Sequence, residues 1–241
     1  MKKVFIGVGH GGSDPGAVGN GFEEADLNLA IALACSSELM RHGVSVRLSR
    51  SKDENDTAME EVRECNEFDP DVAIDIHINS SVGNSGDGAE VFHTIGGGTG
   101  KILAENVLNE ITKIGQNSRG IKTRTNSEGK DYYAFIRLTK APANIIECAF
   151  INNKNDIKII DTPEEQKQMG IAIAKGVLKT LGISFKASNK VDNTPNNYSK
   201  EAVEWAVSNG ILKGDENGDF KLRENITRED ALVFLHRALV K

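Results

Sequence analysis

Two hydrophobic patterns alternate along the first 180 or so residues. Short apolar runs of strand length are each followed, in most cases, by a segment whose apolar residues recur every three or four positions, as on one face of a helix. Alternation at this spacing is typical of an α/β fold, and we predict an open mixed sheet with helices on both faces. The predicted strands are 3–10, 44–50, 71–79, 88–94, 132–138 and 143–150, and the predicted helices are 24–42, 56–68, 98–115 and 163–181.

The pattern changes at Ser184. Residues 184–199 are polar, rich in Asn and nearly free of large apolar side chains, which is the composition of a linker. Residues 200–241 then form two short amphipathic segments around a Gly/Asp/Asn turn, which predicts a small all-α repeat. We therefore expect a domain at 1–183, a linker at 184–199 and a repeat at 200–241. So short a repeat is marginal as an independent core, so we expect a partner surface or self-association to complete it.

Composition narrows the classes of function. The 241 residues are 39% apolar and 27% charged, enough to bury a core, and the net charge of −6 argues against nucleic acid as a partner. No stretch approaches the roughly 20 apolar residues of a membrane span. The apolar run after the first lysines is too short for a signal peptide. The three cysteines form no CxxC pair, which argues against a disulfide framework and a cysteine zinc site.

The stretch GHGGSDPGAVGNGFEEADLNLAIA, from Gly9 to Ala32, joins the first predicted strand to the first predicted helix. Its glycines raise the possibility of a phosphate-binding loop, but no GxxxxGK[ST] motif is present. Asp14 stands where a dinucleotide fingerprint needs its last glycine. Glu23 and Glu24 at the start of the helix would repel a phosphate. A metal site is the better interpretation.

Four polar residues support that interpretation. His10, His77 and Glu147 lie at or near the carboxyl ends of predicted strands, where functional groups gather in open α/β sheets, and Glu24 lies in the first turn of the following helix. Two imidazoles and one carboxylate hold many catalytic zinc ions, and a second carboxylate can serve as general base. Each residue alone also fits a structural role, as a hydrogen-bonding histidine, a helix-terminal charge or half of a buried ion pair.

These residues lie in motifs that resemble those of the zinc-dependent N-acetylmuramoyl-L-alanine amidases. The opening stretch matches the pattern GHGGxDxGAxG…E-x-D-x-x-L, and DIHINS, SRGIK and APANIIECAFINN match later motifs in the same order. The resemblance runs from Lys3 to about Ile183. It implies one Zn²⁺ per catalytic domain, held by His10, Glu24 and His77, with Glu147 as the catalytic acid/base. Glu24 is chosen over its neighbour because E-A-D-L-N-L reproduces the family's spacing.

The same resemblance implies the reaction and the substrate. The substrate is peptidoglycan, and the bond cut is the amide between N-acetylmuramic acid and the L-alanine of the stem peptide. Asn79 and Arg119 lie in the matching motifs and are candidates for orienting the substrate. Two alternatives stay open: a zinc peptidase that acts within the stem peptide, and a wall-binding protein without catalysis.

The C-terminal repeat resembles a single S-layer homology repeat. The resemblance implies binding to secondary cell-wall polysaccharide, with Thr227, Arg228 and Glu229 in the family's ITRxE-type segment. That family usually groups three repeats, so this single repeat is expected to self-associate, with a trimer as the hypothesis.

Together these features predict a peptidoglycan amidase that lyses cell walls, with no nucleic acid and no membrane among its partners. The expected absence of a signal peptide fits a phage endolysin, made in the host cytoplasm and acting on the wall after release. A bacterial autolysin or sporulation amidase is the competing hypothesis.

Overall fold

The computed structural model describes residues 1–187, 195, 199–215, 218–222 and 228–239. The chain divides into two compact units, Met1–Phe185 and Lys186–Lys241, which are described separately. Within the described residues, no helix is both long enough and apolar enough to span a bilayer.

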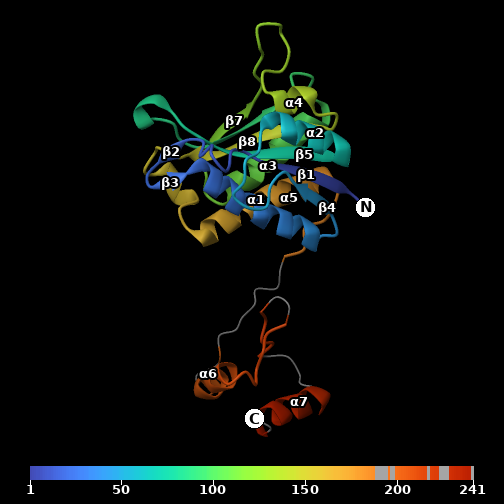
Figure 1. Ribbon diagram of the computed structural model, residues 1–241, viewed down its shortest axis with the longest axis vertical. Helices are drawn as coiled ribbons and strands as arrows, with labels where there is room; N and C mark the ends of the chain where they lie inside the picture. The colour runs from blue at the N-terminus through green and yellow to red at the C-terminus, as the bar shows by residue number, and fades with distance from the viewer. Residues whose placement is uncertain (188–194, 196–198, 216–217, 223–227, 240–241) are drawn as a thin grey trace. The chain divides into compact units, whose positions relative to one another are not determined.

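A six-stranded sheet forms the centre of the N-terminal unit, in the order β4-β1-β5-β8-β6-β7 (Figure 1). Strands β4, β1, β5 and β8 run parallel, β6 is antiparallel to β8, and β7 is parallel to β6. The predicted mixed α/β sheet is therefore confirmed. The strands are β1 (Lys3–Val8), β4 (Ser45–Leu48), β5 (Val72–Asn79), β6 (Ala89–His93), β7 (Ser118–Lys122) and β8 (Ala143–Phe150).

Helices cover both faces of this sheet (Figure 1). One face packs against α1 (Glu24–Arg41), α3 (Gly98–Lys113) and α5 (Pro163–Thr180), and the other against the shorter α2 (Ala58–Phe68) and α4 (Ala134–Leu138). Side chains of a strand alternate between the faces. Val4 and Ile6 therefore enter the larger core with α1, α3 and α5, while Phe5 enters the smaller core with α2 and α4.

The smaller elements lie in the connections. A short hairpin of two-residue strands, β2 (Val18–Gly19) and β3 (Phe22–Glu23), leads into α1. A 3₁₀ turn follows β5 at Val82–Asn84, and another follows β8 at Asp156–Ile159. Helices α2 and α5 each begin with a capping box, in which a threonine hydroxyl and a glutamate carboxylate satisfy each other's backbone N–H groups.

One predicted strand is wrong. Residues 132–138 do not form a strand, because Ala134–Leu138 is the helix α4. Phe135 and Ile136 are both buried in the smaller core although they are adjacent in sequence, which a strand's alternation would not allow on one face. A short apolar run does not distinguish strand from helix, and this one was misassigned for that reason.

The C-terminal unit contains α6 (Lys200–Ser208) and α7 (Arg228–Leu239), as the predicted all-α repeat requires. Arg237 donates a hydrogen bond to the carbonyl of Ile211 at 3.1 Å, which ties α7 to the turn after α6. Among the described residues of this unit, Ile211 is the buried apolar side chain. The exposed large apolar side chains are Trp205, Val207, Leu232, Val233, Leu235 and Leu239.

Candidate active site

The loop after β1 holds its histidine in a conformation that needs glycine around it. His10 has φ of 65°, in the left-handed region, and its Nδ1 donates to the Asp14 carboxylate at 2.8 Å. A Cβ on Gly9 would lie 2.2 Å from the His77 ring, and one on Gly16 would lie 2.7 Å from the Glu24 carboxylate. The glycines of the motif therefore clear space for the polar residues rather than cradle a phosphate.

Glu24 is buried, and backbone hydrogen bonds hold both oxygens of its carboxylate. It lies in the first turn of α1, is 4% exposed, and its Oε2 accepts the backbone N–H of Ala17 at 2.9 Å. Its Oε1 accepts the N–H of Ile78 at 3.0 Å. Burial favours a higher pKa for Glu24, but the hydrogen bonds with His10 and His77 outweigh this effect. The pKa is therefore lowered, and the carboxylate is ionised. The neighbouring Glu23 is exposed.

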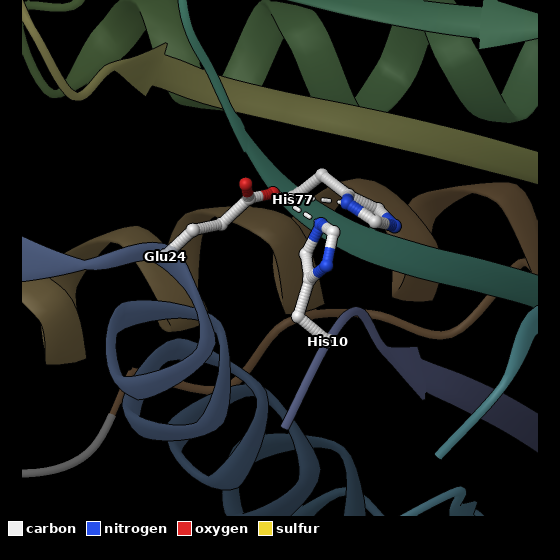
Figure 2. Close-up of side chains that lie close together, drawn as sticks. All are labelled: His10, Glu24 and His77. Carbon is white, nitrogen blue, oxygen red and sulfur yellow. Dashed lines mark hydrogen bonds and ion pairs between the residues drawn. The ribbon is translucent and has the colours of Figure 1, made fainter. Parts of the chain in front are cut away.

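His10, Glu24 and His77 converge from a loop, a helix and a strand (Figure 2). Glu24 Oε1 lies 3.0 Å from His77 Nδ1 and 3.4 Å from His10 Nε2. The potential ligand atoms of the three residues all lie within 4.8 Å of one another. A tetrahedral zinc ion with bonds near 2.0–2.1 Å separates its ligand atoms by about 3.3 Å. The donor set and its spacing are therefore compatible with a bound zinc ion.

Glu147 lies beside this cluster on the central strands. It pairs directly with His77 on β5 and with Glu90 on β6, so the three side chains project from the same face of the sheet. Burial is the main cause that raises the pKa of Glu147 to about 7; the charges of Glu24, Glu90 and Asp75 contribute to the rise, and His77 opposes it. A carboxyl group with this pKa can exchange a proton near neutral pH.

The raised pKa of Glu147 predicts a measurable effect on stability in the metal-free protein. In the unfolded chain the carboxyl has its ordinary pKa of 4.5, so between that value and about 7 the unfolded state loses its proton first. The native protein is therefore expected to lose stability relative to the Glu147→Gln variant across this window, with no difference below it and a constant difference above it. Urea unfolding of both proteins in EDTA at pH ~4 and ~8 measures this. A variant no more stable than the native protein at the higher pH would contradict it.

Asn79 and Arg119, the two candidate substrate residues, meet at one carboxylate. Asn79 Nδ2 donates to Glu90 Oε1 at 3.1 Å, and Arg119 Nε donates to Glu90 Oε2 at 2.6 Å. Lys122 also donates to Glu90. The sequence analysis missed Glu90 and Lys122, although an acid inside the strand GAEVFH is itself a signal. Because Glu90 pairs directly with Glu147 across the sheet, these polar groups lie next to the candidate acid/base.

A third residue that the sequence analysis missed is Arg50, which holds the histidine loop in place. Its side chain is 2% exposed. It donates to the carbonyls of Val8 at 3.0 Å, Gly9 at 3.4 Å and Ala25 at 2.7 Å. One buried guanidinium thus joins the end of β1 to the start of α1, the two segments that carry His10 and Glu24.

Replacing Arg50 with Met is expected to destabilise the N-terminal unit by about 2–4 kcal/mol, because the buried carbonyls lose their donors. Chemical denaturation followed by circular dichroism measures the change. Arg63→Met is the matched control, since Arg63 is 59% exposed and pairs with Glu64 and Glu67 on the surface of α2. Equal effects of the two substitutions would show that Arg50 has no special structural role.

The fold and the cluster define a class of protein: an α/β protein whose candidate metal site lies at the carboxyl ends of its parallel strands, with a buried carboxyl group beside it. Residues 4–179 match the N-acetylmuramoyl-L-alanine amidase family, and the chain belongs to that family. Residues 191–232 match the S-layer homology domain. The chain is thus a cell-wall hydrolase of the amidase type with an S-layer homology repeat.

Similar proteins agree with this assignment. A sporulation-specific N-acetylmuramoyl-L-alanine amidase of Bacillus subtilis is 30% identical over 191 residues, which are 78% of this chain and 72% of that protein. An endolysin of Bacillus phage SPP1 is 28% identical over 236 residues, 91% of this chain and 84% of the endolysin. The solved catalytic domain of CwlV, an amidase from Bacillus (Paenibacillus) polymyxa var. colistinus, superposes with a TM-score of 0.69 at 28% identity. It covers 76% of this chain and all of that domain.

Proposed function

We propose that the N-terminal unit uses one zinc ion, held by His10, Glu24 and His77, to hydrolyse the amide between N-acetylmuramic acid and L-alanine. The observation that carries this proposal is the convergence of the three ligand atoms within 4.8 Å, with Glu147 paired next to His77 on the adjoining strand. Family membership supplies the bond that is cut.

The chemistry divides between the ion and the protein. A zinc ion bound at this site supplies Lewis acidity for the attacking water and for the scissile carbonyl. Glu147 accepts the proton of that water and delivers it to the amine of L-alanine as the stem peptide leaves, which its pKa of about 7 permits. Asn79 and Arg119 orient the substrate beside Glu147, and their hydrogen bonds to Glu90 hold them there.

End-group analysis of purified Gram-positive peptidoglycan tests the proposal. The native protein is expected to release new L-alanine N-termini without new reducing ends, and a chelator should abolish the release until zinc is restored. A different N-terminal residue would identify a peptidase of the stem peptide. Sedimentation with walls and no release at all would leave a binding protein without catalysis.

For the C-terminal unit, we propose binding to secondary cell-wall polysaccharide. Arg228 and Glu229 are exposed in the first turn of α7, and Thr227 lies outside the described residues. Wall binding of the full chain, compared with an Arg228→Ala variant, tests their role, and equal binding by both proteins would remove Arg228 from the site.

Self-association of the repeat is part of the same proposal. It is supported by the exposed apolar side chains of α6 and α7 and by the small core of this unit. We expect a trimer, and sedimentation equilibrium of the full chain gives its mass. A monomer at high concentration would contradict this proposal, whereas loss of the trimer in Leu235→Asp would support α7 as the contact.

The endolysin role is a proposal of its own, supported by the phage relative that matches 91% of this chain. The protein would be made in the host cytoplasm and reach the wall only after release. Expression inside a Gram-positive cell, with and without a pore-forming protein, tests it. Lysis only after the membrane is opened is expected, and equal lysis without the pore would contradict it.

A further inference from the structure

The second ring nitrogen of His77 has a buried carboxylate as its partner. Nε2 of His77 lies 3.1 Å from Oδ2 of Asp75, while Nδ1 on the other side of the ring faces Glu24. Residues 75 and 77 project from the same face of β5 because side chains alternate along a strand. Asp75 is 3% exposed, so solvent does not compete for this contact.

The adjoining strand is shaped around this pair. Gly7 is paired with Asp75 across the sheet, and a Cβ on Gly7 would lie 2.7 Å from the Asp75 Oδ1. Two residues on, a Cβ on Gly9 would overlap the His77 ring. The two glycines thus leave room for a carboxylate and an imidazole side by side, and they leave little freedom for either to move.

His77 is the hydrogen-bond partner of the buried Asp75 carboxylate. Its Oδ1 has no hydrogen-bond partner within the described part of the chain, and His77 is the partner of Oδ2. A buried carboxylate with an unmatched oxygen costs folding free energy. A contribution to folding therefore does not account for this residue, whereas a contribution to the neighbouring histidine does.

We propose that Asp75 is a positioning residue for the metal site: it accepts the Nε2–H of His77 and so presents the Nδ1 lone pair to the ion. The inference rests on the proposed function, because it assumes that His77 is a metal ligand. A histidine that ligates a metal through one nitrogen commonly donates its other N–H to a carboxylate, which fixes the tautomer and raises the ligand's basicity. Here the carboxylate and the histidine belong to the same strand.

Zinc affinity, measured without any substrate, tests the proposal. The full-length metal-free protein is titrated with Zn²⁺ against a chromophoric chelator, for the native chain and for Asp75→Ala and Asp75→Asn. We expect Asp75→Ala to weaken zinc binding about 10–100-fold, and Asp75→Asn to weaken it by a smaller factor because the amide oxygen still accepts the hydrogen bond. Asp71→Asn is the matched control, since Asp71 immediately precedes the same strand and pairs with Lys2 at the surface.

A second measurement separates positioning from general stability. In ¹⁵N spectra of the metal-free native protein at alkaline pH, where the His77 ring is neutral, the ring is expected in the Nε2–H form, and Asp75→Ala is expected to mix the two tautomers. Zinc affinity within threefold of the native value in both Asp75 variants would overturn the proposal, as would an unchanged tautomer. Failure of the native protein itself to bind zinc would instead overturn the proposed function.

Discussion

Glu147→Gln is expected to lower kcat/KM on purified peptidoglycan by about 10²–10⁴-fold, the usual contribution of a general acid/base. Glutamine keeps the size and polarity of the side chain but neither accepts the proton of the attacking water nor delivers one to the leaving amine. Because Glu147 is not among the three converging ligands, the variant should still bind one zinc ion per chain. The rate of new L-alanine N-termini and the metal content of the same sample measure both effects.

Glu128→Gln is the matched control for this experiment. Glu128 is exposed in the connection between β7 and α4, and its carboxylate pairs with Lys130 at the surface, so the activity of this variant should equal that of the native protein. Activity of Glu147→Gln within tenfold of the native value would contradict the assignment of the base. Loss of zinc together with activity would instead make Glu147 a ligand.

The sequence contains enough information for most of the sheet. Strands β1, β5 and β8 are central and buried on both faces, so each is a nearly continuous apolar run. Strand β7 lies at the edge, and its residues Ser118–Lys122 are exposed or half-buried, so its letters carry no strand pattern. The segment that forms α4 was predicted wrongly for a different reason. Its apolar residues fit either a strand or a helix, and the helix places Phe135 and Ile136 in the core that also contains Phe5 and Phe92.

The sequence indicates candidate site residues only where a polar, titratable side chain interrupts an apolar strand or begins a helix. His10, Glu24, His77 and Glu147 are polar residues at strand ends or a helix start, and the resemblance to the amidases supplied their roles. Arg50 and Glu90 act through long-range contacts, whereas Asp75 contacts His77 two positions along the same strand. Arg50 follows strand β4, and its guanidinium donates hydrogen bonds to backbone carbonyls that lie 25–42 positions earlier in the chain. The local sequence does not predict these hydrogen bonds, because they depend on the register of β1 against β4 and β5.

The adjacent glutamates at the start of α1 offer the sharpest test of the metal site. Glu24→Gln is expected to lower activity by on the order of 10³-fold or more, since the ion's contribution is several kcal/mol and each 1.36 kcal/mol is tenfold. The substitution removes the only carboxylate of the ligand set and places an amide NH₂ against a backbone donor, because Ala17 and Ile78 donate to its two oxygens.

Glu23→Gln makes the same chemical change one residue earlier, on an exposed side chain, and should leave zinc binding and activity within about twofold. Both variants lose one negative charge at the start of α1, so a general effect on the helix terminus would appear in both. Zinc titration against a chelator, with activity on the same preparations, distinguishes them. Retained zinc in Glu24→Gln, or equal losses in the two variants, would show that the carboxylate at the centre of the cluster does not hold the metal.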